Sequence, residues 1–548
     1  MQILKFISRE DGGTYARFAL VSLVAAATNA GILMIVNLAA STTYGTITNF
    51  YLFFVFLLTV TLYWVAQRQA FAMIARDVEA TVLRTRLRIL GLVRRCELLT
   101  IEAMGEARIL NALSSQTQVL SQSMSQVTMG VQAVLITLLT GGYIAYVSRP
   151  AFALWLVSVT LSTLLILREW KATQDRLGDA HLRDATFQDT SAALLHGFKE
   201  VKLSRGRAEG LLGELGTLAR ASYDFRIEAQ KGMTRSYVSG QVMFFMLVGA
   251  MVFLLPALGD ISVATLGQAT TAILFVLGPV SMVIGAIPAL ASAEAAARSL
   301  IEMEAVLTRE VASEANARPL PPERRGFQSL ELKNVVFRYP PGALSDGFAI
   351  GPIDFRVTAG EIVFITGGNG AGKSTFLRLL TGLYRPESGT VLLDGRAVDP
   401  DDLQILRDRI AAVFADYFLF HKLYGIEADP VVADALLEEM EIADKTSLQG
   451  DSFTTTRLST GQRKRLALIA AVMDARSVLV LDEWAADQDP IFRRKFYEEV
   501  LPSLKRRGIT VIAATHDDRW FHVADRHIRL ADGRIHEEAA SIETAAQI

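Results

Sequence analysis

A glycine-rich run at residues 367–375 reads GGNGAGKST and carries the strongest chemical signal in the chain. It follows an apolar run, residues 362–366, and precedes a leucine-rich run of helical character. Glycines let backbone N–H groups curl around phosphate oxygens, and a helix start favours an anion at the same place. The pattern predicts a nucleotide phosphate loop made of Gly367, Gly368, Asn369, Gly370, Ala371, Gly372, Lys373, Ser374 and Thr375.

Two carboxylates end a second apolar run, residues 478–483, which reads VLVLDE. Four consecutive apolar residues are typical of a buried parallel strand. Asp482 can hold Mg²⁺ together with the Ser374 hydroxyl, and Glu483 can polarise an attacking water as a general base. Paired carboxylates have many other roles, but a phosphate loop whose lysine lies 109 residues upstream favours this one. Together the two motifs predict hydrolysis of a nucleoside triphosphate with Mg²⁺.

The first 300 residues have a different composition from the rest. They carry 25 Lys and Arg against 19 Asp and Glu, whereas residues 301–548 carry 30 against 38. Five runs of 50, 40, 18, 24 and 33 residues contain no charge, all before residue 294. A membrane helix needs about 20 apolar residues, and soluble proteins rarely lack surface charge over such lengths. These runs exclude a purely soluble protein, and the absence of a strongly basic domain argues against a nucleic-acid partner.

Turn residues divide these runs into six predicted membrane spans. They lie at about residues 18–40, 50–65, 127–147, 151–167, 236–258 and 263–290. The segments 68–125 and 168–235 hold eight and twelve Lys or Arg, whereas the opposite loops hold only Arg149. Positive residues stay on the cytoplasmic side, so the N-terminus and both long loops are expected in the cytosol. We interpret the first apolar run as a retained helix rather than a signal peptide.

The two long loops have the composition of helical hairpins. Leucines recur at helical spacing among arginines, and arms of about 25 residues would reach about 40 Å into the cytosol. The tips are expected near residues 97–105 and 183–190. No charge lies deep within a span. The polar candidates for a translocation path, which could instead bond between helices or anchor at the membrane interface, are Gln132, Tyr143, Tyr146, Gln241 and Gln268. The single cysteine, Cys96, excludes an intramolecular disulfide.

Between the two nucleotide motifs, residues 458–462 read LSTGQ and resemble the signature sequence of ABC transporters. His516 resembles the switch histidine of that family, Tyr339 the aromatic residue that stacks on adenine, and Asp489 the D-loop aspartate. Six spans fused to one such domain resemble an exporter-type half-transporter. The fold class implied is an α-helical membrane domain (1–308), a linker (309–328) and an α/β P-loop ABC ATPase domain (329–548).

Three further stretches resemble the bacterial cyclic-peptide and siderophore-precursor exporters, the pyoverdine and syringomycin exporter family. They are residues 459–468 (STGQRKRLAL), 482–490 (DEWAADQDP) and 197–203 (GFKEVKL). The first two differ from the sequence that is usual in exporters at these positions. One position departs from the transporter pattern itself, because Ala415 stands where a glutamine that contacts magnesium is expected. Either the adjacent Asp416 takes that role through a shifted loop, or no side chain does.

The resemblance implies a dimer in which each ATP lies between the phosphate loop of one chain and the signature of the other. One phosphate loop and one signature per chain make a homodimer the simplest case. Ser459, Gly461 and Gln462 would then complete the partner's site, while Glu483 and His516 act in catalysis. The implied location is the bacterial inner membrane, with the ATPase domain in the cytosol.

Three functions compete. The first is ATP-driven export of a peptide-like siderophore, its precursor or a cyclic peptide. The second uses the same ATPase to move a lipid or hydrophobic drug, or to import a metal–siderophore complex. The third is a regulatory ATPase without transport, against which the intact Glu483 and His516 argue.

Overall fold

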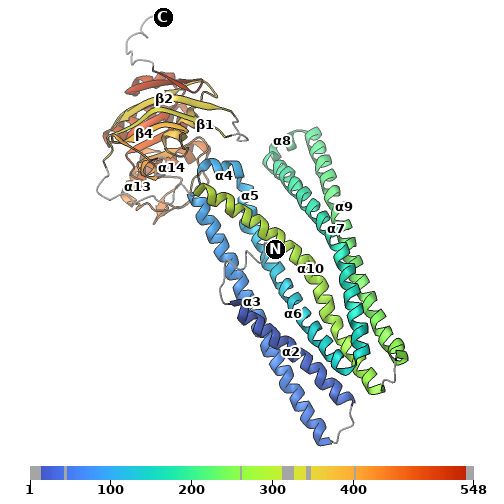
Figure 1. The fold of residues 1–548 in the computed structure, drawn as a ribbon. Coiled ribbons are helices and arrows are strands. Elements are labelled where there is room, and N and C mark those ends of the chain that lie inside the picture. The colour runs from blue at the N-terminus through green and yellow to red at the C-terminus, as the bar shows by residue number, and fades with distance from the viewer. Residues whose placement is uncertain are drawn as a thin grey trace. The chain divides into compact units, whose positions relative to one another are not determined.

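The computed structural model describes residues 14–41, 46–258, 262–311, 326–340, 347–399 and 403–537 (Figure 1). The chain forms two compact units. One combines Met1–Leu90 with Leu110–Glu304, and the other combines Gly91–Ile109 with Ala305–Ile548. Most of the linker expected at 309–328 lies outside the described residues. The second unit therefore contains the ATPase domain and a short segment from the first long loop.

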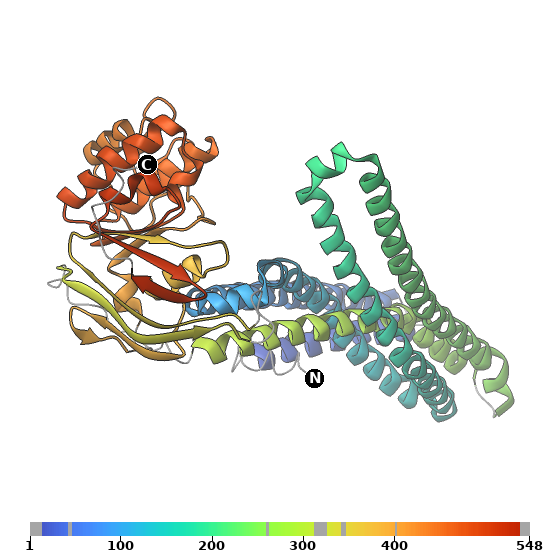
Figure 2. The same cartoon turned by 90° about the horizontal axis from the view of Figure 1, so that it is seen from above.

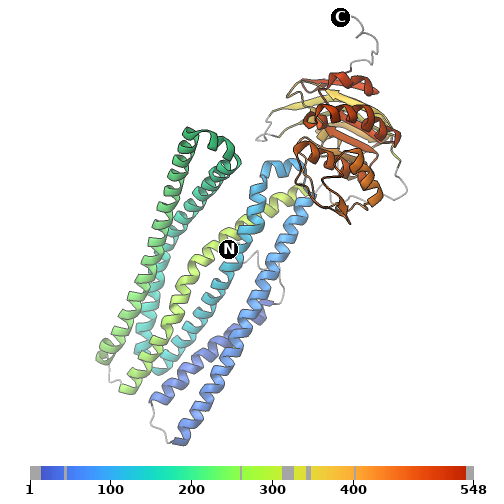
Figure 3. The ribbon, with the colours of Figure 1, turned by 180° about the vertical axis from the view of Figure 1, so that it is seen from behind.

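Long helices build the first unit (Figures 1 and 3). They are α2 (Thr14–Ser41), α3 (Thr46–Arg95), α6 (Thr117–Val147), α7 (Arg149–His196), α9 (Arg205–Gly249) and α10 (Val263–Val311). Five helices in the described part of the chain are long and apolar enough to cross a membrane. The fourth predicted span corresponds to a shorter apolar stretch, Arg149–Leu165, at the start of α7. Helices suit this setting because they satisfy every backbone N–H and C=O internally.

The helices of this unit pack through small and apolar side chains. A buried cluster joins Ile144 of α6, Ala151 and Trp155 of α7, and Ala272 of α10. Met251 belongs to it and lies in η2 (Ala250–Leu254), which continues into η3 (Leu255–Leu258). Helices α7 and α9 lie antiparallel along most of their length (Figure 2). This packing holds together the helices that make up the fourth, fifth and sixth predicted spans.

Two of the polar side chains predicted within the spans bond between helices. Gln132 is buried and accepts a hydrogen bond from Gln67 at 3.2 Å. The Tyr143 hydroxyl accepts one from the buried Asn37 at 3.3 Å. For these two the interpretation as interhelical hydrogen bonds is confirmed. Tyr146, in contrast, is 83% exposed.

The tip of the first cytosolic loop lies where the sequence predicts it. Helix α3 ends at Arg95, a short helix α4 (Leu98–Met104) follows, and α5 (Glu106–Asn111) begins the return. The return continues through η1 (Ala112–Gln116) into α6. Gly105 permits the turn because its φ is +79°, a left-handed conformation that other residues rarely adopt.

The prediction of the second tip at 183–190 is wrong. Helix α7 continues through that segment to His196, and the tip is the short helix α8 (Phe198–Leu203). Gly197 ends α7, and the Ser204 hydroxyl accepts a hydrogen bond from the Arg207 N–H at the start of α9. The stretch 197–203, noted above for its resemblance to the exporter family, is this tip.

The ATPase half contains two main sheets (Figure 2). The first has the order β2-β1-β4-β5, and the second β12-β11-β3-β10-β9-β6. The strands are β1 (Ser329–Arg338), β2 (Ala349–Thr358), β3 (Ile362–Thr366), β4 (Ser388–Leu393), β5 (Arg396–Ala397), β6 (Ile410–Val413), β9 (Val478–Asp482), β10 (Thr510–Ala514), β11 (Arg526–Ala531) and β12 (Arg534–Glu537). Strands β11, β3, β10, β9 and β6 run parallel to one another.

Helices and a small hairpin complete this half. The α-helices are α11 (Lys373–Leu380), α12 (Gln404–Arg407), α13 (Pro430–Glu439), α14 (Thr460–Met473), α15 (Pro490–Lys495) and α16 (Leu501–Arg506). Shorter helical turns are η4 (Trp484–Asp487), η5 (Phe496–Val500) and η6 (Asp518–Val523), and the hairpin pairs β7 (Leu448–Gln449) with β8 (Ser452–Phe453). Separate buried clusters line the two faces of the parallel sheet, and β3, β9 and β10 contribute to both.

Candidate ATP-binding and hydrolysis site

The candidate site lies at one edge of the second sheet, where the parallel strands β3, β10, β9 and β6 end. Ala514 at the end of β10 lies beside Ile365 of β3 and Asp482 of β9, and Leu481 lies beside Val413 of β6. The residues that follow these strands therefore emerge together. Ligands of open α/β sheets bind at this carboxyl edge. The topology thus brings the phosphate loop, Glu483 and His516 into one place.

The phosphate loop turns sharply between β3 and α11. Gly370 and Gly372 have φ values of +79° and +98°, and a Cβ atom on Gly372 would lie 2.9 Å from the side chain of Ile350. Glycine at position 372 therefore serves both the backbone conformation and the close approach. Helix α11 begins directly afterwards, so its first N–H groups point into the loop.

The Lys373 ammonium is the cationic centre of the site. It is 6% exposed and donates hydrogen bonds to the carbonyls of Gly367 at 3.1 Å and Gly368 at 3.5 Å. His516 Nε2 lies 2.9 Å from Lys373 Nζ and 3.2 Å from Glu483 Oε1. Lys373 Nζ also lies 3.4 Å from Glu483 Oε1. The lysine, the histidine and the glutamate predicted from three separate motifs thus meet.

Asp482 is suited to a hard cation. It is 2% exposed, and its Oδ1 atom is among the few buried side-chain atoms of the described chain without a hydrogen-bond partner. Burial raises the pKa of this carboxyl; a hydrogen bond from the Ser374 hydroxyl opposes the rise, and the charge of Glu483 adds to it. A buried acceptor without a donor, beside a hydroxyl, matches the oxygen ligands that Mg²⁺ prefers. The described residues contain no cluster of three acidic, histidine or cysteine ligands, so a cation here would also need phosphate oxygens.

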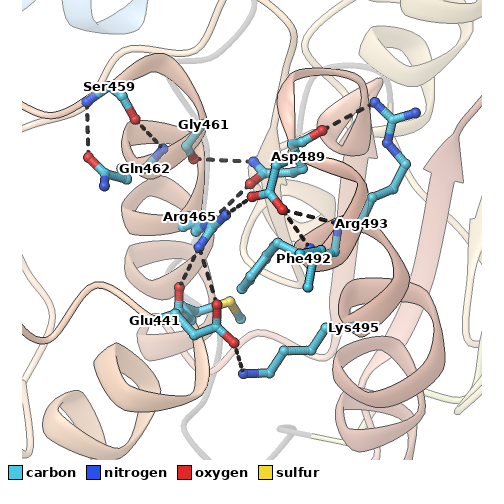
Figure 4. A network of polar contacts seen from close by, with 12 residues as sticks. Glu441, Ser459, Gly461, Gln462, Arg465, Asp489, Phe492, Arg493 and Lys495 are labelled. Atoms are coloured by element: carbon cyan, nitrogen blue, oxygen red, sulfur yellow. Dashed lines mark hydrogen bonds and ion pairs between the residues drawn. The ribbon is translucent and has the colours of Figure 1, made fainter.

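The signature segment starts helix α14 and is firmly capped. The Ser459 hydroxyl accepts from the Gln462 N–H, and the Gln462 side chain accepts from the Ser459 N–H (Figure 4). This reciprocal pair leaves the helix start with a fixed geometry. Gly461 lies against the D-loop, because a Cβ atom there would lie 2.9 Å from the Asp487 carbonyl oxygen.

Asp489 joins the D-loop to the signature helix. Arg465 of α14 donates to its Oδ2 atom at 2.7 Å, and the N–H groups of Ile491 and Phe492 donate to Oδ1 (Figure 4). These N–H groups and the Arg465 charge lower the pKa of Asp489. The structure therefore gives this predicted nucleotide-binding residue the role of capping α15, and a contact with nucleotide stays a prediction.

Comparisons with known proteins fit this geometry. Residues 350–486 match the family model described as "ABC transporter". The chain is 36% identical over 474 residues to the ATP-binding protein SyrD of Pseudomonas syringae pv. syringae, covering 82% of each chain. The chain belongs to the ABC transporter family. It falls in the group that contains SyrD, which confirms the resemblance predicted from the sequence.

Two further proteins show how far the transporter's likeness extends. A bacterial Atm1-family ABC exporter solved with ATP bound has a TM-score of 0.77 over 96% of this chain and 95% of that one, at 17% identity. The exporter fold is therefore confirmed. The ATP-dependent lipid A-core flippase of Paraburkholderia xenovorans (strain LB400) is 32% identical over 238 residues, 41% of this chain and 40% of the flippase. The transporter is an ATPase of the inner membrane, with its ATPase domain in the cytosol.

Tyr339, for which the family resemblance implies adenine stacking, is largely buried in the ATPase domain. The residue is 8% exposed and packs against Phe337 and Phe348. Its hydroxyl lies 3.2 Å from the Thr375 hydroxyl and 3.4 Å from that of Tyr384. A stacking platform needs an open ring face, so the structure shows a core residue that supports α11, and adenine stacking stays a prediction.

The loop after β6 carries Ala415 and Asp416 where the family resemblance implies a magnesium-contacting glutamine. The Ala415 N–H hydrogen-bonds to Asp482 through the backbone, whereas Asp416 is largely exposed and forms an ion pair with Arg378 at 3.0 Å. Asp416 therefore contacts the end of α11 rather than the carboxylate at the centre of the site. Of the two alternatives left open by the sequence, the one in which no side chain takes over the role agrees with these contacts.

A polar cluster that sequence reasoning missed surrounds Arg378. This residue, in the last turn of α11, donates to Glu102 of α4 at 3.4 Å and to the Tyr384 hydroxyl at 2.9 Å. The Tyr384 hydroxyl donates to the other oxygen of Glu102 at 2.9 Å. Burial raises the pKa of Tyr384, so it stays a neutral donor. Glu102 lies in the predicted tip, but nothing in its spacing indicated a partner almost 280 residues away.

Proposed function

We propose that the transporter exports a peptide-like molecule, a cyclic peptide or a siderophore precursor, across the bacterial inner membrane. One observation carries the proposal: 36% identity to SyrD over 82% of both chains, which extends beyond the ATPase domain into the membrane half. The family to which the sequence resemblance points transports such molecules. The flippase match covers only 41% of the chain and does not favour a lipid equally.

The catalytic roles follow from the contacts. Lys373 would hold the β- and γ-phosphates, and the N–H groups of the glycine loop would surround the phosphate oxygens. Glu483 would take the proton of the attacking water, and His516, within 3.2 Å of it, would contact the γ-phosphate. Asp482 and Ser374 would hold Mg²⁺, which lowers the charge of the phosphates when it is bound. Most of the catalysis would come from positioning and charge stabilisation.

Two copies of the chain would assemble two composite sites. In each site, Ser459, Gly461 and Gln462 of one chain would face the phosphate loop of the other. The start of α14 supports this arrangement, because Ser459 and Thr460 are exposed there and the positive end of a helix dipole favours the γ-phosphate. A chain with one phosphate loop and one signature needs such a partner to complete either site.

A cavity in the membrane half supports a substrate with an apolar part. It lies among α6, α7, α9 and α10 and encloses about 250 Å³. Aliphatic and aromatic side chains such as Val134, Phe244 and Val280 line it, with hydroxyls of Thr137, Ser158 and Ser162. The volume suits one aliphatic group rather than a whole cyclic peptide. We therefore place part of the substrate path here.

ATPase measurements in reconstituted bilayers test the function. The transporter is assayed with and without a panel of cyclic peptides and siderophore precursors, next to Glu483→Gln. We expect saturable stimulation by at least one compound and a loss of activity of about 10²–10⁴-fold in the variant, because a general base typically contributes that much. A basal rate that no peptide-like compound changes would contradict this substrate class. Equal, negligible turnover in both proteins would contradict the ATPase engine.

Crosslinking tests the homodimer. The native cysteine is replaced first (Cys96→Ser), and two differently tagged chains then carry Ser374→Cys and Ser459→Cys respectively. With ATP we expect a crosslink that joins the two tags. Exclusively intrachain products from a chain that carries both cysteines would contradict the composite site.

A further inference from the structure

Two stretches of the ATPase domain, residues 459–468 and 482–490, differ from the usual exporter sequence. In the structure these two stretches contact each other. The first, in α14, contains Lys464, and the second contains Trp484 and Asp487 of η4. Lys464 Nζ lies 2.7 Å from the Asp487 carboxylate, and the Trp484 indole donates to the Lys464 carbonyl at 3.0 Å. Departures that lie 20 residues apart therefore form one unit.

At the centre of this unit is the main chain of Glu483. Lys464 donates to the Glu483 carbonyl oxygen at 3.0 Å, and the Ala486 N–H donates to the same atom. On the other side, the Glu483 N–H donates to the Ala514 carbonyl. Glu483 has φ and ψ of 48° and 38°, a left-handed conformation that is costly for a residue with a Cβ atom. Such a conformation persists only where its surroundings fix it.

The burial of Lys464 makes this contact specific. The residue is 4% exposed, and lysine is almost never fully buried unless it is paired. Its ammonium donates to the Glu483 carbonyl and pairs with the half-exposed Asp487 carboxylate. Trp484 is 1% exposed and packs against Phe496 with tilted rings, so it holds the lysine main chain from the core side. The ammonium therefore has little freedom to leave Glu483.

We propose that Lys464 is a positioning residue for hydrolysis, which holds the main chain of Glu483 in the left-handed conformation that directs its carboxylate toward His516 and Lys373. The inference rests on the function proposed above. Because Lys464 lies in the signature helix, it also links the two composite sites. The signature of a chain would act on the partner's ATP, whereas Glu483 of the same chain acts on its own. When the ATPase domains of the two chains close on ATP, a shift of α14 would move the main chain of Glu483 through the Lys464 side chain.

The main test is Lys464→Met, which keeps the length of the side chain and removes the ammonium. We expect kcat for ATP to fall about tenfold, which is about 1.4 kcal/mol of transition-state stabilisation. The KM for ATP should change less than twofold, because Lys464 contacts no part of the phosphate loop. Unchanged kcat would overturn the proposal, and so would a fall in kcat matched by lost nucleotide binding.

Three further variants separate positioning from mere stability. Asp487→Asn keeps an acceptor for the ammonium and should lower kcat less than Lys464→Met. Trp484→Phe removes the indole donor but keeps an aromatic ring, and should lower kcat in part. If Lys464→Met does not fold, Trp484→Phe becomes the decisive variant. Full activity of Trp484→Phe would then overturn the proposal. Lys445→Met, at an exposed lysine paired only with Asp444, is the matched control and should keep wild-type kcat.

Glu483→Gln distinguishes a failure of this inference from a failure of the proposed function. If Glu483→Gln loses turnover but Lys464→Met does not, the hydrolysis mechanism stands and the positioning role is wrong. If Glu483→Gln keeps turnover, the assigned general base is wrong, and the inference falls with it.

Discussion

Helices α4 and α8 are the tips of the two cytosolic loops. They differ in the contacts that each makes with the rest of its own chain. Helix α4 is anchored, since Leu98 and Leu99 pack against the core of the ATPase unit and Glu102 meets Arg378 and Tyr384. Helix α8 exposes its large apolar side chains, since Phe198 and Leu203 are 50% and 88% exposed. The first tip thus has a polar attachment inside its own chain, whereas the second presents apolar side chains.

From this difference we infer that the first tip contacts the ATPase domain of its own chain, whereas the second tip contacts another molecule. Charged hydrogen bonds fix the orientation of α4 relative to α11. A movement of α11 would therefore move the first tip. Large contiguous apolar patches mark surfaces that another molecule covers, and we infer that Phe198 and Leu203 belong to such a surface. In a homodimer, the second chain is the obvious candidate to cover it. The following variants test this division, beginning with the largest expected effect.

Arg378→Met should loosen the first tip most. It removes the donor to Glu102, Tyr384 and Asp416 at once, and hydrogen bonds to charged groups contribute about 1.5–3 kcal/mol each. We expect hydrogen exchange of residues 97–105 to quicken by about tenfold or more. Arg396→Met, at an exposed arginine of β5, is the control. Unchanged protection of the tip would show that apolar packing alone anchors α4.

Phe198→Glu should affect the second tip without affecting the fold. The side chain is half exposed in the single chain, so the thermal unfolding midpoint should change little. In the assembled transporter, a charge placed at a covered surface should lower peptide-stimulated ATPase activity by about fivefold, or about 1 kcal/mol. Phe198→Leu keeps the apolar character and should retain activity. Wild-type stimulation in Phe198→Glu would remove the distinction between the tips.

Glu102→Gln sharpens the comparison at the level of one charge. An amide oxygen can still accept from Arg378 and Tyr384, but the charge is lost. Since charge-assisted hydrogen bonds are about twice as strong as neutral ones, exchange of residues 97–105 should quicken by about threefold. Glu106→Gln, at an exposed position of α5, should change nothing. An effect as large as that of Arg378→Met would mean that charge alone holds the tip.

Asp416→Asn should have the smallest effect. Its carboxylate is 71% exposed, and exposed ion pairs contribute about 0–1 kcal/mol. Exchange at the tip and the ATPase rate should therefore change by about twofold or less. A loss of activity comparable to that of Glu483→Gln would show that Asp416 replaces the missing glutamine after all.

The sequence predicted what local spacing determines. The phosphate loop from Gly367 to Ser374, the strand before Asp482 and the capped signature at Ser459 each occupy consecutive residues, so their chemistry is readable in order. The first tip, expected at residues 97–105, includes Gly105, which ends α4. The second was misplaced although Gly197, a helix-ending residue, was part of a noted motif.

What escaped prediction depends on distance in space. The contact of Lys464 with the Glu483 carbonyl joins two elements through a side chain and a backbone atom, which leave no spacing pattern. The same holds for Glu102 and Arg378. The motif predicts that Tyr339 contacts the nucleotide, whereas its burial depends on Phe348 and Tyr384, which come from other elements and which its motif does not indicate. Residue type alone does not distinguish an open ring from a packed one.

The shortness of α11 has a thermodynamic consequence. Lys373 begins this eight-residue helix and Arg378 lies in its last turn, so about 7.5 Å of helical rise separates the phosphate loop from the attachment of α4. Energetic coupling between two binding events is reciprocal. If nucleotide binding changes the substrate affinity of the membrane half by some factor, then substrate must change nucleotide affinity by the same factor. A substrate could therefore be recognised without any transport assay, from the shift that it causes in the dissociation constant of ATP.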